Sequence, residues 1–203
     1  MRIRIDLKIF IFIIIFYFTS QVEIYSILML FAFVHELAHL LVGILLKLKP
    51  KSAQIMPFGF SIYFEDYSKQ YEIKKILIAL AGPVINLVLV VMGCIYNWKE
   101  QIIYANLLIG LFNLIPLYPL DGGRVLKYIL KLTAGNGEDA DELVHQISKI
   151  ILILLTVVSS IGIIYMENIA ILFVIAYLWA IMIDSRKDYK MKTRIRELIS
   201  QNR

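Results

Sequence analysis

Cysteine is nearly absent from this chain of 203 residues, which contains Cys94 alone. A single cysteine cannot form an internal disulfide, and it excludes a metal site built from several thiolates. Cys94 lies in an apolar run, so we interpret it as a packing residue. A cleavage site of the Ala-x-Ala kind is also missing after the apolar segment Ile9–Phe18. We therefore expect that segment to be a retained membrane segment and not a signal peptide.

Apolar residues are abundant instead. Hydrophobic residues make up 60% of the chain and the mean hydropathy is +0.75, whereas a soluble domain is about 45–50% apolar. The excess lies in long runs that a soluble core could not bury, which predicts an integral membrane protein. We interpret six runs as membrane helices, although the first and fourth are shorter than the ~20 residues of a straight crossing. They are Ile9–Thr19, Ile24–Leu46, Ile76–Tyr96, Ile102–Leu117, Ile147–Tyr165 and Ile169–Ile183.

Basic residues fall almost entirely on one side of this six-helix topology. The net charge is +5, and of the 21 Lys and Arg residues only Lys99 lies on the other side. The positive-inside rule makes the basic side cytosolic, with both termini there. This explains the charge without nucleic acid as a partner. We assign residues 1–183 to one membrane domain and residues 184–203 to a basic cytosolic tail, which could lie on anionic lipid as a helix or retain the topology by charge alone.

Two cytosolic connections carry further expectations. The connection Lys47–Lys75 contains apolar and aromatic residues within Ala53–Glu65, which predict a short β-hairpin at the membrane interface. The connection Gly135–Glu142 is acidic and lacks the ligand spacing of a calcium loop, so we expect it to be solvated. His145 has no neighbour at metal-ligand spacing, and we expect it to be solvated in the same connection.

The second predicted helix contains His35-Glu36-Leu37-Ala38-His39. Residues four apart lie on one face of a helix, so His35 and His39 can bind one ion, and imidazole nitrogen suits zinc. Catalytic zinc keeps a position open for water, which Glu36 can reach as a general base. Ionisable groups within a membrane cost about 3 kcal/mol on insertion scales and need compensation. The alternative is an interhelical hydrogen-bond cluster.

A third ligand is needed for tight zinc binding and should come from another helix. Asp121 lies in Pro119–Gly123, after the fourth run, and a carboxylate can complete a site of two histidines and one acid. Asn113 precedes Asp121 by eight residues. Its amide could stabilise the oxyanion of a tetrahedral intermediate, or it could serve interhelical packing.

The third predicted helix carries Gly82-Pro83-Val84-Ile85-Asn86. Glycine and proline could permit close helix packing or a kink. Asn86 needs a partner within the membrane and could hydrogen-bond to a metal ligand. From the residues alone, both interpretations stay open.

These motifs together resemble those of the site-2 proteases, the intramembrane zinc proteases. Three motifs match in order: His35-Glu36-x-x-His39, Gly82-Pro83-x-x-Asn86, and Asn113-x-x-Pro116-x-x-Pro119-Leu120-Asp121-Gly122-Gly123. The resemblance implies an all-α integral membrane fold of six transmembrane helices with a short β-hairpin between the second and third.

The resemblance also implies roles for individual residues. It implies zinc held by His35, His39 and Asp121, Glu36 as the group that activates water, and Asn113 near the scissile carbonyl. The expected partners are the lipid bilayer, a membrane-associated protein substrate, and membrane inhibitory or regulatory proteins.

Within that family, the Pro57-Phe58-Gly59 hairpin and the Pro-Leu-Asp-Gly-Gly form are most similar to the sporulation protease of the stage IV FB type. This implies a bacterial outer forespore membrane and a sigma-factor precursor as substrate. About twenty residues follow Ile183, so we expect no CBS domain in this chain. The Lys47–Lys75 connection is too short for the PDZ domain of other branches.

Other functions fit parts of the sequence less well. A second type of membrane zinc protease uses a downstream glutamate ligand on a helix, but Glu138 and Glu142 are expected in a loop. A metal-ion transporter needs polar residues along several helices, and the fifth and sixth runs have almost none. An inactive relative that only binds partners would not need Glu36. The sequence therefore favours a zinc metalloprotease acting beside the cytosolic face.

Overall fold

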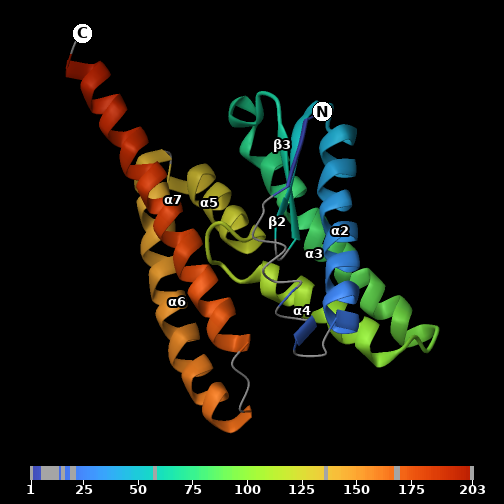
Figure 1. The fold of residues 1–203 in the computed structure, drawn as a ribbon. Helices are drawn as coiled ribbons and strands as arrows, with labels where there is room; N and C mark the ends of the chain where they lie inside the picture. Colours follow the sequence, from blue (N-terminus) through green and yellow to red (C-terminus); the bar gives the residue numbers. More distant parts are fainter. Residues whose placement is uncertain are drawn as a thin grey trace. The chain divides into compact units, whose positions relative to one another are not determined.

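The computed structural model describes residues 2–5, 14, 17–18, 22–56, 59–134, 137–166 and 170–201. The chain divides into two compact units, Met1–Ile115 and Pro116–Arg203, which are described separately below (Figure 1). The first unit contains β1 (Arg2–Ile5), α2 (Val22–Leu45), β2 (Pro50–Met56), β3 (Gly59–Phe64), a 3-10 turn (Tyr67–Lys69), α3 (Glu72–Ile95) and α4 (Glu100–Leu114). The second contains α5 (Asp121–Ala134), α6 (Gly137–Met166) and α7 (Ala170–Gln201).

A small three-stranded sheet lies in the first unit, in the order β1-β2-β3. Strands β2 and β3 are antiparallel, which confirms the predicted hairpin, although β2 begins three residues before Ala53. Strand β1 pairs with β2 in parallel, from Arg2 opposite Ser52 to Ile5 opposite Ile55. This strand was not predicted, although the strict alternation of arginine and isoleucine is the two-residue period of a strand.

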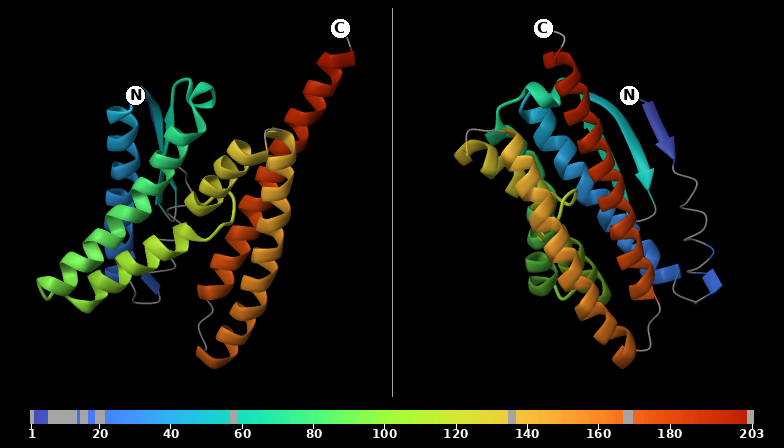
Figure 2. Two further views of the ribbon diagram at one scale, coloured as in Figure 1. Left: turned by 180° about the vertical axis from the view of Figure 1, so that it is seen from behind. Right: turned by 90° about the vertical axis from the view of Figure 1, so that its left-hand side faces the viewer.

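The three helices of the first unit pack on one another, with α3 in contact with both α2 and α4 (Figures 1 and 2). Helix α2 also contacts α4, and it contacts the hairpin mainly through β3. At that second contact the ring of Phe64 lies against Gly43, where a β-carbon would overlap the ring. The hairpin is thus held closely along the helix that carries the His-Glu-x-x-His motif.

Helices α2 and α3 bury polar and small residues and expose large apolar ones. The buried face of α2 includes His35, His39 and Gly43, while Leu30 and Leu41 are exposed. The buried residues of α3 follow a helical stripe of Lys75, Ile78, Ala79, Gly82, Pro83, Asn86 and Gly93. An apolar exterior around a polar, closely packed interior is the arrangement expected for helices surrounded by lipid.

Three of the described helices contain segments long and apolar enough to cross a membrane: Val22–Leu45, Glu72–Ile95 and Asp139–Ser160. They support a membrane protein of mostly helical fold. The predicted run Ile9–Thr19 falls almost wholly outside the described residues. The count of six transmembrane helices stays a prediction.

In the second unit, α5 packs on α6, and α6 and α7 run side by side in all views (Figures 1 and 2). Lys127 and Lys131 of α5 both lie 3.1 Å from Oδ1 of Asp141 on α6. The expectation of a solvated connection over Gly135–Glu142 is therefore wrong from Gly137 onward, because that residue begins α6. Asp141 in this segment pairs with lysines of α5. Acidic groups near the amino terminus of a helix are also favoured by the helix dipole.

His145 lies within α6 and not in a loop, so that expectation is wrong as well. Its partly buried ring meets the ring of Tyr118 edge-on, with centroids 5.9 Å apart. Helix α7 continues without a break past Asp184, where the predicted tail begins.

Candidate metal centre

His35 and His39 lie one turn apart on the buried face of α2. Their ring centroids are 4.8 Å apart and the ring planes are inclined by 82°. Both residues are 5% exposed, although each carries a polar ring that water would otherwise solvate. Polar groups that deeply buried need defined partners, and the two rings have them.

The Nδ1 atom of each ring faces a partner on α3. Nδ1 of His39 lies 2.6 Å from the carbonyl oxygen of Ile78, which can only accept, so the ring donates from Nδ1. Nδ1 of His35 lies 2.5 Å from Oδ1 of Asn86. With the proton of each neutral ring on Nδ1, each Nε2 carries the lone pair with which imidazole binds a metal.

Gly82 marks the point where the two Nε2 atoms meet. A β-carbon built on this residue would collide with Nε2 of both His35 and His39. The next residue, Pro83, has no backbone N–H, so the carbonyl of Ala79 loses its helical donor. The absence of a side chain at Gly82 therefore leaves the room that the two rings occupy against α3.

Asp121 is the first residue of α5 and is 5% exposed. An acidic side chain at a helix amino terminus is favoured by the helix dipole, and Nη1 of Arg124 lies 3.6 Å from its Oδ1. The preceding loop folds back closely, because a β-carbon on Gly123 would overlap the backbone of Leu117 and Tyr118. The loop is fixed to α6 by a hydrogen bond of 2.9 Å from the backbone N–H of Tyr118 to Oγ of Ser148.

Among the described residues, one group of His, Cys, Asp and Glu side chains could hold a metal ion, and it consists of His35, His39 and Asp121. One ligand atom from each lies within 4.8 Å of the other two, and all three residues are buried. Two imidazole nitrogens and one carboxylate oxygen match the donor set of catalytic zinc, with a fourth position left for water. The residues present thus fit the zinc ion that the sequence predicted.

The two other predicted site residues occupy different settings. Glu36 follows His35 on α2 and is partly buried. Asn113 lies in the last turns of α4, where its Nδ2 donates a hydrogen bond of 3.0 Å to the carbonyl of Ile109 on the same helix. An amide nitrogen carries two hydrogens, so its second N–H can donate to a substrate oxygen while the first stays with Ile109.

Sequence reasoning missed Asn106 and the carbonyl of Ile78. Asn106 on α4 is 0% exposed and accepts a hydrogen bond of 2.9 Å from Nδ2 of Asn86. A polar side chain within an apolar helix is itself a signal of a functional or paired group. The sequence therefore contained a signal for Asn106. It contained none for the contact of His39 with Ile78, because every residue has a backbone carbonyl.

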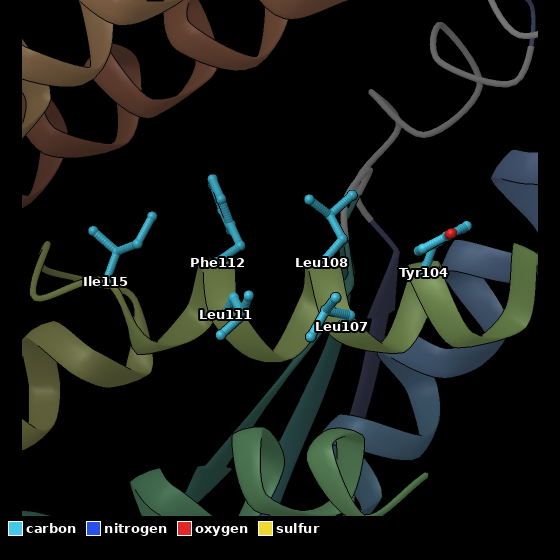
Figure 3. Close-up of a pocket in the computed structure, with 6 residues that line it drawn as sticks. All are labelled: Tyr104, Leu107, Leu108, Leu111, Phe112 and Ile115. Carbon is cyan, nitrogen blue, oxygen red and sulfur yellow. The ribbon is translucent and has the colours of Figure 1, made fainter. Parts of the chain in front are cut away.

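An open pocket of about 570 Å³ lies along another face of α4 (Figure 3). Its lining is apolar apart from one hydroxyl and consists of Tyr104, Leu107, Leu108, Leu111, Phe112 and Ile115. At 100° per residue these positions centre on the side of α4 opposite Asn106 and Asn113. The pocket is therefore separate from the polar groups described above.

Comparisons with known proteins agree with this geometry. The family model described as peptidase family M50 matches residues 92–155, which include Asn113 and Asp121. A Synechocystis sp. protein named as a zinc metalloprotease is 38% identical over 122 residues, covering 54% of this chain and 32% of the relative. A zinc metalloprotease of Methanocaldococcus jannaschii is 31% identical over 112 residues, covering 50% and 32%.

The chain is thus similar over part of its length to peptidase family M50 and to proteins named as zinc metalloproteases. Stage IV sporulation protein FB of Bacillus subtilis is 26% identical over 116 residues, covering 53% of this chain and 40% of that protein. The chain thus spans about a third of the length of the curated relatives it matches. A solved structure, the site-2 protease of Methanocaldococcus jannaschii, matches with a TM-score of 0.71 at 19% identity, over 90% of this chain and 89% of that one. That likeness shows the fold, and the match to the model of peptidase family M50 agrees with the resemblance seen in the motifs.

Proposed function

We propose that this chain is an intramembrane zinc metalloprotease that hydrolyses peptide bonds of membrane-associated proteins near the cytosolic face. The observation that carries the proposal is the group of His35, His39 and Asp121, whose ligand atoms lie within 4.8 Å of one another in a buried setting. Similarity to peptidase family M50 and to relatives named as zinc metalloproteases supports the same reaction class.

The proposed mechanism assigns one task to each residue. His35, His39 and Asp121 hold the zinc ion, which when bound polarises the scissile carbonyl and lowers the pKa of water to about 7. Glu36 takes a proton from the attacking water and delivers it to the leaving amine. Asn113 donates the second N–H of its amide to the developing oxyanion.

The substrate must present an extended segment, because a helix hides its carbonyl groups in its own hydrogen bonds. The β-hairpin of β2 and β3 lies along α2, and an extended segment could add to it as a further strand. The sigma-factor precursor of sporulation is the finer prediction for the substrate. Its support is the similarity to the stage IV sporulation protein of Bacillus subtilis.

The proposed topology has six transmembrane helices with both termini in the cytosol of a bacterium. The outer forespore membrane is the finer prediction for its location. The support for the topology is the distribution of Lys and Arg, of which Lys99 alone lies on the opposite side of the predicted spans. Membrane inhibitory or regulatory proteins are the further partners that we expect.

Glu36→Gln tests the proposal directly. The purified protein in lipid discs is incubated with a panel of membrane-tethered substrates, and cleavage is followed by mass spectrometry. We expect Glu36→Gln to reduce cleavage about 100-fold or more while zinc is retained, because a general base contributes about 10²–10⁴-fold. Glu23→Gln, the same substitution at an exposed position of the same helix, should cleave like the wild type. Full activity of Glu36→Gln would refute the assignment of the base.

A further inference from the structure

A series of hydrogen bonds connects His35 to the backbone of α4 through two buried amides. Nδ1 of His35 lies 2.5 Å from Oδ1 of Asn86. Nδ2 of Asn86 donates to Oδ1 of Asn106 over 2.9 Å, and Nδ2 of Asn106 donates to the carbonyl of Ile102 over 2.9 Å. Both asparagines are 0% exposed, so water does not compete for these bonds.

The last hydrogen bond of this series fixes which amide atoms donate and which accept. The carbonyl of Ile102 can only accept, so Asn106 must turn its nitrogen to that carbonyl and its oxygen to Asn86. Asn86 must then offer its nitrogen to Asn106 and its oxygen to His35. Because that oxygen can only accept, the proton of a neutral His35 ring must sit on Nδ1, and Nε2 keeps its lone pair.

Close packing of α3 and α4 makes this series of hydrogen bonds possible. A β-carbon on Gly110 of α4 would lie 3.3 Å from Cβ of Asn86 and 3.6 Å from the carbonyl oxygen of Pro83. This small residue lies one helical turn after Asn106 and lets the two helices approach. Asn106 is consequently held by packing as well as by its two hydrogen bonds.

We propose that Asn106 is a positioning residue that sets the tautomer of His35 through Asn86 and so presents Nε2 to the metal. Asn106 itself touches neither metal nor substrate. The inference rests on the proposed function for the identity of the metal, whereas its effect on the His35 ring exists in the metal-free protein too. His39 is independent of it, because its ring donates directly to Ile78.

The primary measurement is the ¹⁵N spectrum of metal-free full-length protein with labelled histidine, at alkaline pH where imidazole is neutral. The chain has three histidines, so single substitutions assign every signal. We expect both His35 and His39 of the wild type to carry the proton on Nδ1. A wild-type His35 protonated on Nε2 would overturn the proposal without the use of any variant.

Asn106→Leu then tests causation, since it removes both amide groups at similar size. We expect the His35 signal to move towards the other tautomer while the His39 signal stays, and zinc affinity in chelator competition to fall about 10–100-fold. Asn106→Asp should keep the His35 signal at its wild-type position, because a carboxyl oxygen can accept from Nδ2 of Asn86 in either protonation state. Unchanged His35 signals and zinc affinity in Asn106→Leu would contradict the proposal.

Leu107→Ala is the matched control, because it removes packing from the next position of α4 without touching the hydrogen bonds (Figure 3). It should lower stability and leave the His35 signal in place. A shift of the His35 signal in Leu107→Ala equal to that in Asn106→Leu would show general loosening and overturn the proposal. Absence of peptide cleavage by the wild type, with a His35 signal that responds to Asn106→Leu, would refute only the proposed function.

Discussion

The surroundings of His35 and of His39 differ although the two rings lie one turn apart on the same helix. The His39 ring donates to a backbone carbonyl, that of Ile78. The His35 ring donates to a side chain, Asn86, which depends in turn on Asn106. A backbone carbonyl survives every substitution, whereas an amide can be replaced. The comparison teaches that one metal site can combine a ring held by the fold itself with a ring held by particular side chains.

Removal of either histidine ligand should abolish the difference between the two rings and cause the largest loss of zinc. We expect His35→Ala and His39→Ala to lose zinc alike, by more than the roughly 100-fold range of outer partners, because each removes one donor of three. Zinc content after dialysis against a chelator provides the measurement. His145→Ala, the same substitution in α6 outside the metal group, should retain zinc. Zinc retained by either ligand variant would exclude that ligand.

Gly82→Ala should disturb both rings together, with the next largest effect. The added methyl group would collide with Nε2 of His35 and of His39, so we expect zinc affinity to fall at least about 10-fold. Gly93→Ala on the same helix is the control, because there the added group meets the side chains of Ile103 and Trp98 and neither histidine. Equal zinc affinities of the two variants would place the metal away from Gly82.

Asn86→Leu should affect His35 and leave His39 unchanged. It removes the acceptor of His35 and leaves the contact of His39 with Ile78 intact, so we expect about a 10–100-fold loss of zinc affinity. In the metal-free protein only the ¹⁵N signals of His35 should change. Leu87→Ala, at the next position of α3, serves as the packing control. A change in the His39 signals of Asn86→Leu, as large as that in His35, would contradict independent anchoring.

Ile78→Val should give the smallest effect on the metal. The substitution removes one methylene from a residue that is 5% exposed and leaves the carbonyl that holds His39. We expect a stability loss of about 0.5–1.5 kcal/mol, measured by denaturant unfolding, with wild-type zinc affinity. A marked loss of zinc would show that the side chain of Ile78, and not its carbonyl, positions His39.

Site features that lie within one helix could be predicted from the sequence, whereas features that join separate elements were harder to predict. His35 and His39 share one helix, so helical periodicity alone placed them together. Asp121 lies in another element and was found through the chemistry that two histidines require. The pairing of Asn86 with Asn106 depends on how closely α3 approaches α4, which Gly110 sets in three dimensions, and so it was missed.

The fold shows the same division. The β-hairpin was predicted from its composition, whereas the pairing of β1 with β2 joins residues about fifty positions apart and is short. The start of α6 was misread because its acidic residues looked solvated, although Asp141 pairs with Lys127 and Lys131 of α5. Contacts between elements decided both cases, and one-dimensional patterns do not contain them.

Zinc X-ray absorption at the K-edge tests the central claim most directly, combined with metal quantification on the purified chain and on Asp121→Asn. The account predicts one zinc ion per chain, bound by two imidazole nitrogens at about 2.0–2.1 Å and by oxygen at about 2.0–2.2 Å, and loss of that ion in Asp121→Asn. A wild type without stoichiometric zinc, or an unchanged zinc spectrum in Asp121→Asn, would contradict it.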